Sequence, residues 1–204
     1  MLNAIKHCMG NLTNFAGRDP RTTFWFFVLF LFIAQVVIAQ IAAIPIYVAT
    51  VQGTFEAASQ GGDPAATAPA IMAGLAGEFG TLALVNIAVG VIAALLLLAA
   101  FVRRLHDAGF SGWIAAIPLA AQAFNSAYAY NSLGRLEELT NAVLAESASG
   151  GSQMNAYAAQ AQMDALGLVG YIGYAVIIGF GVLKSQDGDN RYGPNPHGVK
   201  PAAD

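Results

Sequence analysis

The distribution of Lys and Arg around four apolar runs is the feature that most constrains this chain. The runs cover about residues 24–48, 81–101, 113–130 and 165–183. Eight of the nine basic residues lie before the first run, between the second and third, or after the fourth, and only Arg135 lies in the other two connections. Because basic segments stay on the cytoplasmic side, this alternation predicts four membrane spans with both termini in the cytoplasm.

The overall composition agrees with this membrane topology. Hydrophobic residues make up 56% of the chain and charged residues only 10%, whereas a soluble domain carries about 25% charged residues. The predicted outer connections, 49–80 and 131–164, hold one basic and seven acidic residues. The predicted cytoplasmic segments, which include the turn 102–112 and the tail 184–204, hold eight basic and five acidic residues. This side is therefore expected to meet anionic lipid headgroups, whereas nucleic-acid binding is not expected from so few, scattered basic residues.

The predicted fold is all-α: a single membrane domain over residues 1–204, built as a four-span bundle of two helical hairpins. Apolar residues at helical spacing also occupy 71–79 and 133–143, within the outer connections, and Ser152 is a candidate N-cap. We therefore expect the helices to extend beyond the membrane on the outer side. The alternative is two disordered loops rich in Ala, Ser and Gly.

Several residues predict where helices begin, bend or end. Asp19 followed by Pro20 is suited to cap the first spanning helix, and Pro45 is expected to bend it near its far end. Gly109 is suited to end the second spanning helix in a left-handed conformation, and Ser111 to cap the next one.

The N-terminal region carries a weaker signal. Apolar residues at helical spacing over 2–12 predict a short helix in the membrane interface, with a frayed soluble terminus as the alternative. The first apolar run begins late, at Phe24, and is too long for the core of a signal peptide, so we expect it to be retained. Cys8 is the only cysteine, which excludes an internal disulfide. No metal or cofactor is predicted, because the histidines and Cys8 lack regular ligand spacing.

The central parts of the predicted spans contain no Asp, Glu, Lys, Arg or His. This argues against a proton-coupled pump, because ionisable groups inside the membrane mark proton and ion pathways. Interhelical hydrogen bonds are favoured over a substrate path as the role of the polar residues that remain, namely Gln35, Gln40, Asn86, Gln122 and Asn125.

Two predicted cytoplasmic segments are dense in polar side chains. The turn between the second and third spans carries Arg103, Arg104, His106 and Asp107, which serve either as topogenic and turn residues or as a headgroup or ligand site. His106 titrates near neutral pH, but a lone His beside one Asp is weak support for catalysis, and no catalytic residue is assigned. The tail segment 184–196 does not match the twelve-residue calcium loop.

At these segments the chain resembles the domain-of-unknown-function 805 family of small bacterial inner-membrane proteins. Three stretches carry the resemblance: Gly17-Arg18 with Arg21 and Phe24-Trp25, then Arg103-Arg104-Leu105-His106-Asp107-Ala108-Gly109-Phe110-Ser111-Gly112-Trp113, and finally Asp189-Asn190-Arg191-Tyr192-Gly193-Pro194 with Pro196. The chain departs from the family pattern at Thr23, Phe110 and Ile114 and in its long outer connections. The resemblance implies a polytopic inner-membrane protein and supplies no activity.

All three stretches lie on the cytoplasmic side of the predicted topology, and we expect them to meet there. Buried charges need partners, so a network of opposite charges is predicted to dock the tail onto the bundle. The predicted network sets the cations Arg18 or Arg21, Arg103, Arg104 and Arg191 against Asp107 and Asp189.

Three functions follow from this interpretation. The leading one is a non-enzymatic membrane protein whose cytoplasmic polar cluster binds anionic lipid headgroups or a partner. The alternatives are a small transporter or channel subunit, for which a homo-oligomer would supply the polar path, and a membrane enzyme that acts on a lipid headgroup. The candidate ligand-binding cluster consists of Arg18, Arg21, Arg103, Arg104, His106, Asp107, Asp189, Asn190, Arg191 and Tyr192.

Overall fold

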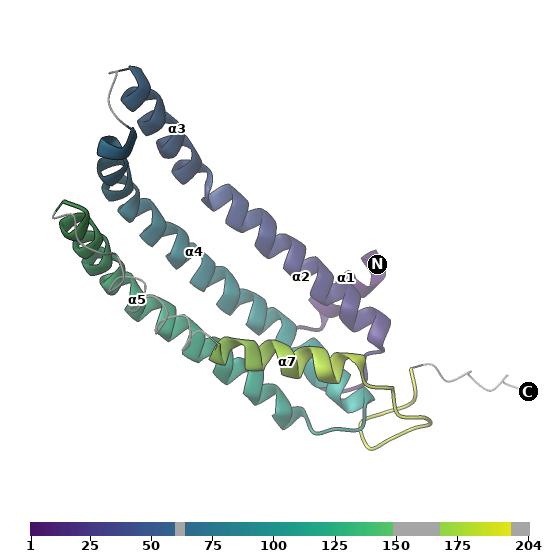
Figure 1. Cartoon of the computed structure of the whole chain (residues 1–204). Helices are drawn as coiled ribbons and strands as arrows, with labels where there is room; N and C mark the ends of the chain where they lie inside the picture. The colour runs from purple at the N-terminus through teal and green to yellow at the C-terminus, as the bar shows by residue number, and fades with distance from the viewer. Residues whose placement is uncertain (60–63, 149–167, 197–204) are drawn as a thin grey trace, which may run out of the picture. The chain divides into compact units, whose positions relative to one another are not determined.

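The structure, a computed structural model, describes residues 1–59, 64–148 and 168–196 and is drawn in Figure 1. No β-strand occurs in these ranges, where a single isolated bridge joins Asn190 and Gly193, and the all-α prediction is confirmed. The helices, in chain order, are α1 (Leu2–Gly10), α2 (Arg21–Ala42), α3 (Ile44–Ser59), α4 (Pro64–Asp107), the 3-10 turn η1 (Gly112–Ala115), α5 (Ala116–Ala148) and α7 (Val169–Val182).

Two of the helices are much longer than a membrane is thick. Helix α4 has 44 residues and α5 has 33. At 1.5 Å per residue, α4 is about 66 Å long, against a hydrocarbon core of about 30 Å. The predicted helical character of the two long connections is confirmed over 49–59, 64–80 and 131–148. The predicted cap at Ser152 lies outside the described residues.

The predicted bend at Pro45 is an interruption of one residue. Helix α2 ends at Ala42 and α3 begins at Ile44. Proline has no N–H to donate to the carbonyl four residues earlier, and its ring clashes with that carbonyl, which explains the break. The helix resumes at once, because the backbone N–H of Tyr47 donates to the carbonyl of Ala43 at 3.2 Å.

Within the part of the chain that the structure describes, two segments are long and apolar enough to cross a membrane, Arg21–Glu56 and Glu78–Asp107. Only 17% and 6% of their most apolar windows are buried by the rest of the protein, so neither resembles the core helix of a soluble domain. Helix α7 is apolar but has only 14 residues, fewer than the roughly 20 that cross a bilayer. The predicted spans 113–130 and 165–183 stay predictions.

The chain divides into two compact units. The first comprises Met1–Gln35, Gly90–Phe124 and Val169–Asp204, and it contains all three sequence stretches of the family resemblance. The second comprises Val36–Val89 and Asn125–Leu168. In the second unit, the hydroxyl of Thr50 donates to the carbonyl of Ile46 at 2.7 Å, a bond along the helix itself. Because the three sequence stretches supply the candidate site residues, the candidate site lies in the first unit.

The core of the first unit joins α1, α2, α4 and η1. Helix α1 enters this core through Cys8, which is buried, whereas Leu2 and Met9 are exposed. The predicted short N-terminal helix is thus confirmed as a helix, and within its apolar stripe Leu12 also packs against the cluster that contains Cys8, whereas Leu2 and Met9 do not. The two buried clusters consist of Phe24, Phe101, Val102, Leu105 and Ala115, and of Cys8, Phe27, Leu31 and Ala100.

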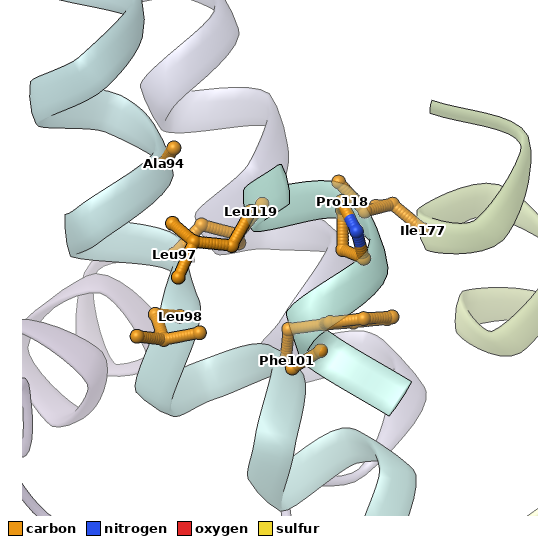
Figure 2. A pocket seen from close by; sticks show the side chains of 8 residues that line it. Ala94, Leu97, Leu98, Phe101, Pro118, Leu119 and Ile177 are labelled. Carbon is orange, nitrogen blue, oxygen red and sulfur yellow. The ribbon is translucent and has the colours of Figure 1, made fainter. Parts of the chain in front are cut away.

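Helices α4, α5 and α7 pack around a small apolar cavity of about 40 Å³. Figure 2 shows its lining, with Leu97, Leu98 and Phe101 from α4, Pro118 from α5 and Ile177 from α7. The side chains that line it offer water no hydrogen-bond partners. The small volume of this cavity means that α4, α5 and α7 leave little free space between them. Such packing depends on how closely the helix backbones approach one another.

The closest approach between α7 and α2 occurs at Gly181. A Cβ added there would lie 2.8 Å from Cζ2 of Trp25 and 2.9 Å from Cε1 of Phe24. Gly179, two residues earlier on the same helix, has no atom within 4 Å of the corresponding position. The absence of a side chain at Gly181 is thus required by the two aromatic rings.

We expect Gly181→Ala to lower the temperature at which the purified protein unfolds in detergent, because overpacking costs about 1–3 kcal/mol. Gly179→Ala is the matched control, and it should leave the protein unchanged or slightly more stable, because alanine favours helix over glycine by about 1 kcal/mol. Equal unfolding temperatures for both variants in a thermal unfolding assay would contradict this close packing.

Candidate functional site

The last turn of α4 positions the central polar residues. Gly109 has φ +82°, and the N–H of Phe110 donates to the carbonyl of Leu105 at 2.9 Å, a Schellman-type end. The Ser111 hydroxyl accepts a bond from the N–H of Trp113 at 3.4 Å and caps η1, which leads into α5. Both predicted caps, Gly109 and Ser111, are confirmed. They fix residues 103–107 at the end of a helix, next to the tail.

Arg18, Arg104 and Asp107 form a fully buried charge cluster, which we call the tail cluster. Asp107 is 0% exposed and accepts bonds from Nε of Arg18 at 3.2 Å and from Nη1 of Arg104 at 2.5 Å. Its second oxygen also accepts the Ser185 hydroxyl at 2.5 Å, and its carbonyl accepts the N–H of Gln186 at 2.8 Å. One carboxylate therefore joins the segment before α2, the end of α4 and the tail.

The side chain of Arg18 holds the tail by donating to backbone carbonyls of the tail rather than to tail side chains. Nη1 of Arg18 donates to the carbonyl of Gly188 at 2.8 Å, and Nη2 donates to the carbonyl of Gln186 at 2.7 Å. A planar guanidinium holds five N–H donors in a fixed fork, so it can satisfy several carbonyls and a carboxylate at once. The segment 186–188 is thereby held in place with little dependence on its own side chains.

Arg104 caps the C-terminal end of α7. Its Nε donates to the carbonyl of Gly181 at 3.2 Å, and its Nη2 donates to the carbonyl of Leu183. The last carbonyls of a helix lack intrahelical partners and carry the negative end of the helix dipole. The cation is thus stabilised by Asp107 on one side and by a helix terminus on the other.

A second buried pair, Asp19 with Arg103, forms the N-terminal cluster. Nε of Arg103 donates to Oδ2 of Asp19 at 2.8 Å, and Nη1 donates to the carbonyls of Asn11 and Asn14 at 2.8 Å and 2.5 Å. Nε2 of His7 lies 2.9 Å from the other oxygen of Asp19. The prediction that Asp19 caps the following helix is wrong, because its carboxylate is engaged by Arg103 and His7.

The tail motif docks on the end of α4 through an aromatic stack. The ring of Tyr192 lies parallel to that of His106, with centroids 3.8 Å apart, and Arg191 lies 4.6 Å above the Tyr192 ring. The amide of Asn190 donates to the carbonyl of His106 at 2.9 Å and accepts the N–H of Tyr192 at 2.9 Å. A turn closed by Asn190 and Gly193 therefore presents Tyr192 to His106.

The structure separates the ten predicted site residues into two groups. It brings seven together at one end of the first unit, either in the buried clusters or in the stack, namely Arg18, Arg103, Arg104, His106, Asp107, Asn190 and Tyr192. It leaves Arg21, Asp189 and Arg191 outside the buried clusters. Within the described residues, Asp189 accepts the N–H of Asn195 at 2.9 Å and pairs with no arginine.

The expected network was therefore right about which segments meet and wrong about two of its members. Arg191 and Asp189 do not enter it, because the turn at 190–193 directs them to the surface. Sequence reasoning missed Asp19 as a partner of Arg103. Its position directly after Arg18 was the available signal, because neighbouring residues in an extended segment point to opposite sides and here engage opposite clusters.

The buried charges do not balance. Among the residues whose burial the structure describes, three arginines and two aspartates are buried, which leaves one positive charge in excess. Arg21 lies close enough to Arg104 for the two like charges to interact, and no described carboxylate forms an ion pair with Arg21. An anion near Arg21 would therefore be favoured electrostatically.

Other reactive groups in the described region are inert. Burial raises the pKa of the Cys8 thiol to about 11; the nearby Asp19 carboxylate adds to the rise and Arg103 opposes it. The thiol is therefore protonated, and unreactive, at neutral pH. Within residues 1–59, 64–148 and 168–196, no group of three His, Cys, Asp or Glu side chains is placed to hold a metal ion.

The fold is all-α over the described residues, and its two largely unburied helices of membrane-crossing length suggest association with a membrane. The family model described as Protein of unknown function (DUF805) matches residues 12–194. The chain belongs to this family, as its three motifs predicted. Neither a curated protein nor a solved structure matches the chain.

We expect Asp107→Asn to loosen the tail, because it leaves two buried arginines without their carboxylate. Breaking a buried pair costs about 3–5 kcal/mol. Trypsin should then cleave after Lys184 and Arg191 faster than in the wild-type protein, as followed by mass spectrometry of the released peptides. Asp187→Asn is the matched control, because Asp187 forms an exposed pair with Lys184 at 2.8 Å, and such pairs contribute little. Equal cleavage rates in the two variants would refute the docking role of Asp107.

Proposed function

We propose that this chain is a multi-pass bacterial inner-membrane protein with both termini in the cytoplasm, whose cytoplasmic end binds the headgroup of an anionic phospholipid. The observation that carries the proposal is the excess of one buried positive charge, among the described residues, at one end of the first unit. The buried arginines set this field, and Arg21 is the residue that meets the lipid.

The membrane part of the proposal is supported by the exposed apolar helices. Leu29, Phe32, Ile92 and Leu95 lie in the two segments of membrane-crossing length, and each is at least 44% exposed. Exposed apolar surface of this extent is favourable in lipid and unfavourable in water. The orientation is supported by the sequence, because the basic residues of the three motifs flank the apolar runs on the same predicted side.

The headgroup part of the proposal is supported by a difference in burial and pairing between Arg21 and the three buried arginines. Arg18, Arg103 and Arg104 are 8%, 3% and 0% exposed and donate to carboxylates and carbonyls, so their role is structural. Arg21 is only partly buried and begins α2. A cation at the first turn of a spanning helix sits at headgroup depth, where each basic residue contributes about 1 kcal/mol toward an anionic membrane.

The two alternatives receive less support from the same geometry. Enzymatic use of His106 and Asp107 would need both groups to reach a substrate, but one ring face of His106 is stacked on Tyr192 and Asp107 is fully buried with its oxygens occupied. Transport would need a polar path through the bilayer, and residues 24–48 and 81–101 contain no ionisable side chain apart from Tyr47.

The topology predicts which engineered cysteines react from each side of the membrane. Lys184→Cys should be labelled by a membrane-impermeant maleimide only after the cytoplasmic side is opened, whereas Ser59→Cys should be labelled from the periplasm. Both positions are exposed. Cys8 can remain in the background, because its buried, protonated thiol is a poor nucleophile. Labelling of position 184 from the periplasm would overturn the orientation.

The headgroup proposal predicts a preference for phosphatidylglycerol over phosphatidylcholine in native mass spectrometry of the purified protein. We expect Arg21→Gln to reduce that preference about fivefold, the equivalent of about 1 kcal/mol. Lys184→Gln is the control, because Asp187 already neutralises this exposed lysine. An unchanged preference in Arg21→Gln would remove the headgroup proposal without affecting the topology.

A further inference from the structure

A large apolar groove lies on the first unit, between α2, α4 and α7. Its volume is about 350 Å³, more than twice that of an engineered cavity of about 150 Å³ that binds benzene. Leu29, Phe32 and Ile178 line it and are 44%, 59% and 54% exposed, so the groove opens outward from the protein. It is distinct from the 40 Å³ cavity of Figure 2, although Ala94, Leu97 and Ile177 contribute to both.

The floor of the groove is made by the smallest side chains of α4. Gly90, Ala93, Ala94 and Leu97 line it at spacings of three, four and seven residues, which places them on one face of the helix. A Cβ added at Gly90 would lie 2.9 Å from Nε2 of Gln122, the end of a flexible side chain that can shift aside. Small residues on this face leave space that the neighbouring helices do not fill.

The groove has the length and polarity of one leaflet of a bilayer. On α2 it extends from Trp25 to Gln35, ten residues or about 15 Å, which is half of the roughly 30 Å hydrocarbon core. The indole N–H of Trp25 donates to the carbonyl of Gly181 at 3.2 Å, so only its ring faces the groove. Besides Trp25, polar lining side chains come only from Gln35 and Tyr174. A water-soluble ligand would find few partners there.

We propose that this groove holds an acyl chain of a phospholipid bound to the protein. The mouth of the groove is continuous with the headgroup site, because Arg21 and Trp25 are four residues apart on α2 and share one face. An anionic headgroup at Arg21 thus places a chain directly over the ring of Trp25. The headgroup end of this arrangement rests on the proposed function above, whereas the chain end stands on the groove alone.

The test compares Ala93→Leu, which fills the floor, with Ala88→Leu, which adds the same side chain at an exposed position of α4. Detergent-purified proteins are titrated with phosphatidylglycerol and, separately, phosphatidylcholine, and one-lipid adducts are counted by native mass spectrometry. We expect Ala93→Leu to weaken both adducts about tenfold, equivalent to about 1.4 kcal/mol. Ala88→Leu should bind both lipids as the wild-type protein does.

A second measurement protects the result against misfolding of Ala93→Leu. Trp113→Phe leaves Trp25 as the only tryptophan, and phosphatidylcholine with brominated chains should quench its fluorescence and saturate at one lipid per protein. Quenching that rises without saturation means only bulk lipid contact and overturns the proposal. So does equal binding by the two alanine variants, or a lipid-free dimer, which would assign the groove to a second copy.

The outcomes also separate this inference from the headgroup proposal. Loss of the phosphatidylglycerol preference in Arg21→Gln, together with unchanged adducts in Ala93→Leu, would keep the headgroup site and reject the groove. Weaker adducts of both lipids in Ala93→Leu, with an unchanged preference in Arg21→Gln, would do the reverse.

Discussion

The buried carboxylate of Asp107 is the constraint on which the first unit depends. Arg18 and Arg104 cannot be taken out of water without a counter-charge and enough acceptors for their N–H groups. Asp107 supplies the charge, and backbone carbonyls of the tail and of α7 supply the acceptors. Three segments far apart in the sequence are therefore placed by one requirement, that a buried cation be satisfied. Asp19 and Arg103 place the N-terminal segment by a similar pairing, although Nη2 of Arg103 is buried without a hydrogen-bond partner.

This constraint is compatible with apolar helices because the charges are confined to helix ends. The last turn of α4 carries Arg103, Arg104 and Asp107, whereas the preceding stretch is almost entirely apolar. Arg104 also satisfies carbonyls at the end of α7, a helix too short to be stable through backbone bonds alone. The tail cluster thus orders a marginal helix, and the close contact of Gly181 with Trp25 and Phe24 sets its distance from α2.

Sequence reasoning succeeded where a local rule decides the structure. The left-handed end at Gly109, the cap at Ser111 and the helical stripes of the long connections follow from backbone sterics and periodicity, which need no knowledge of distant residues. It failed in the choice of partners, because Asp189 was expected in the network and Asp19 was not, whereas Asp19 pairs with Arg103 and Asp189 accepts the N–H of Asn195. It also gave no sign of the carbonyl acceptors that hold Arg18, since every residue has one.

The burial of Arg18, Arg103 and Arg104 limits which substitutions can test lipid binding without disturbing the structure. Substituting Arg18, Arg103 or Arg104 removes a buried cation and releases the tail or the N-terminal segment, so any loss of lipid binding would follow from lost structure. Arg21 carries the same charge at the same end of the unit, but no described carboxylate pairs with it. Its side chain is therefore the one whose removal changes the electrostatic field at the mouth of the groove and leaves both clusters intact. Lipid binding at this end of the first unit is therefore best tested at Arg21 and at the α4 residues that form the floor of the groove.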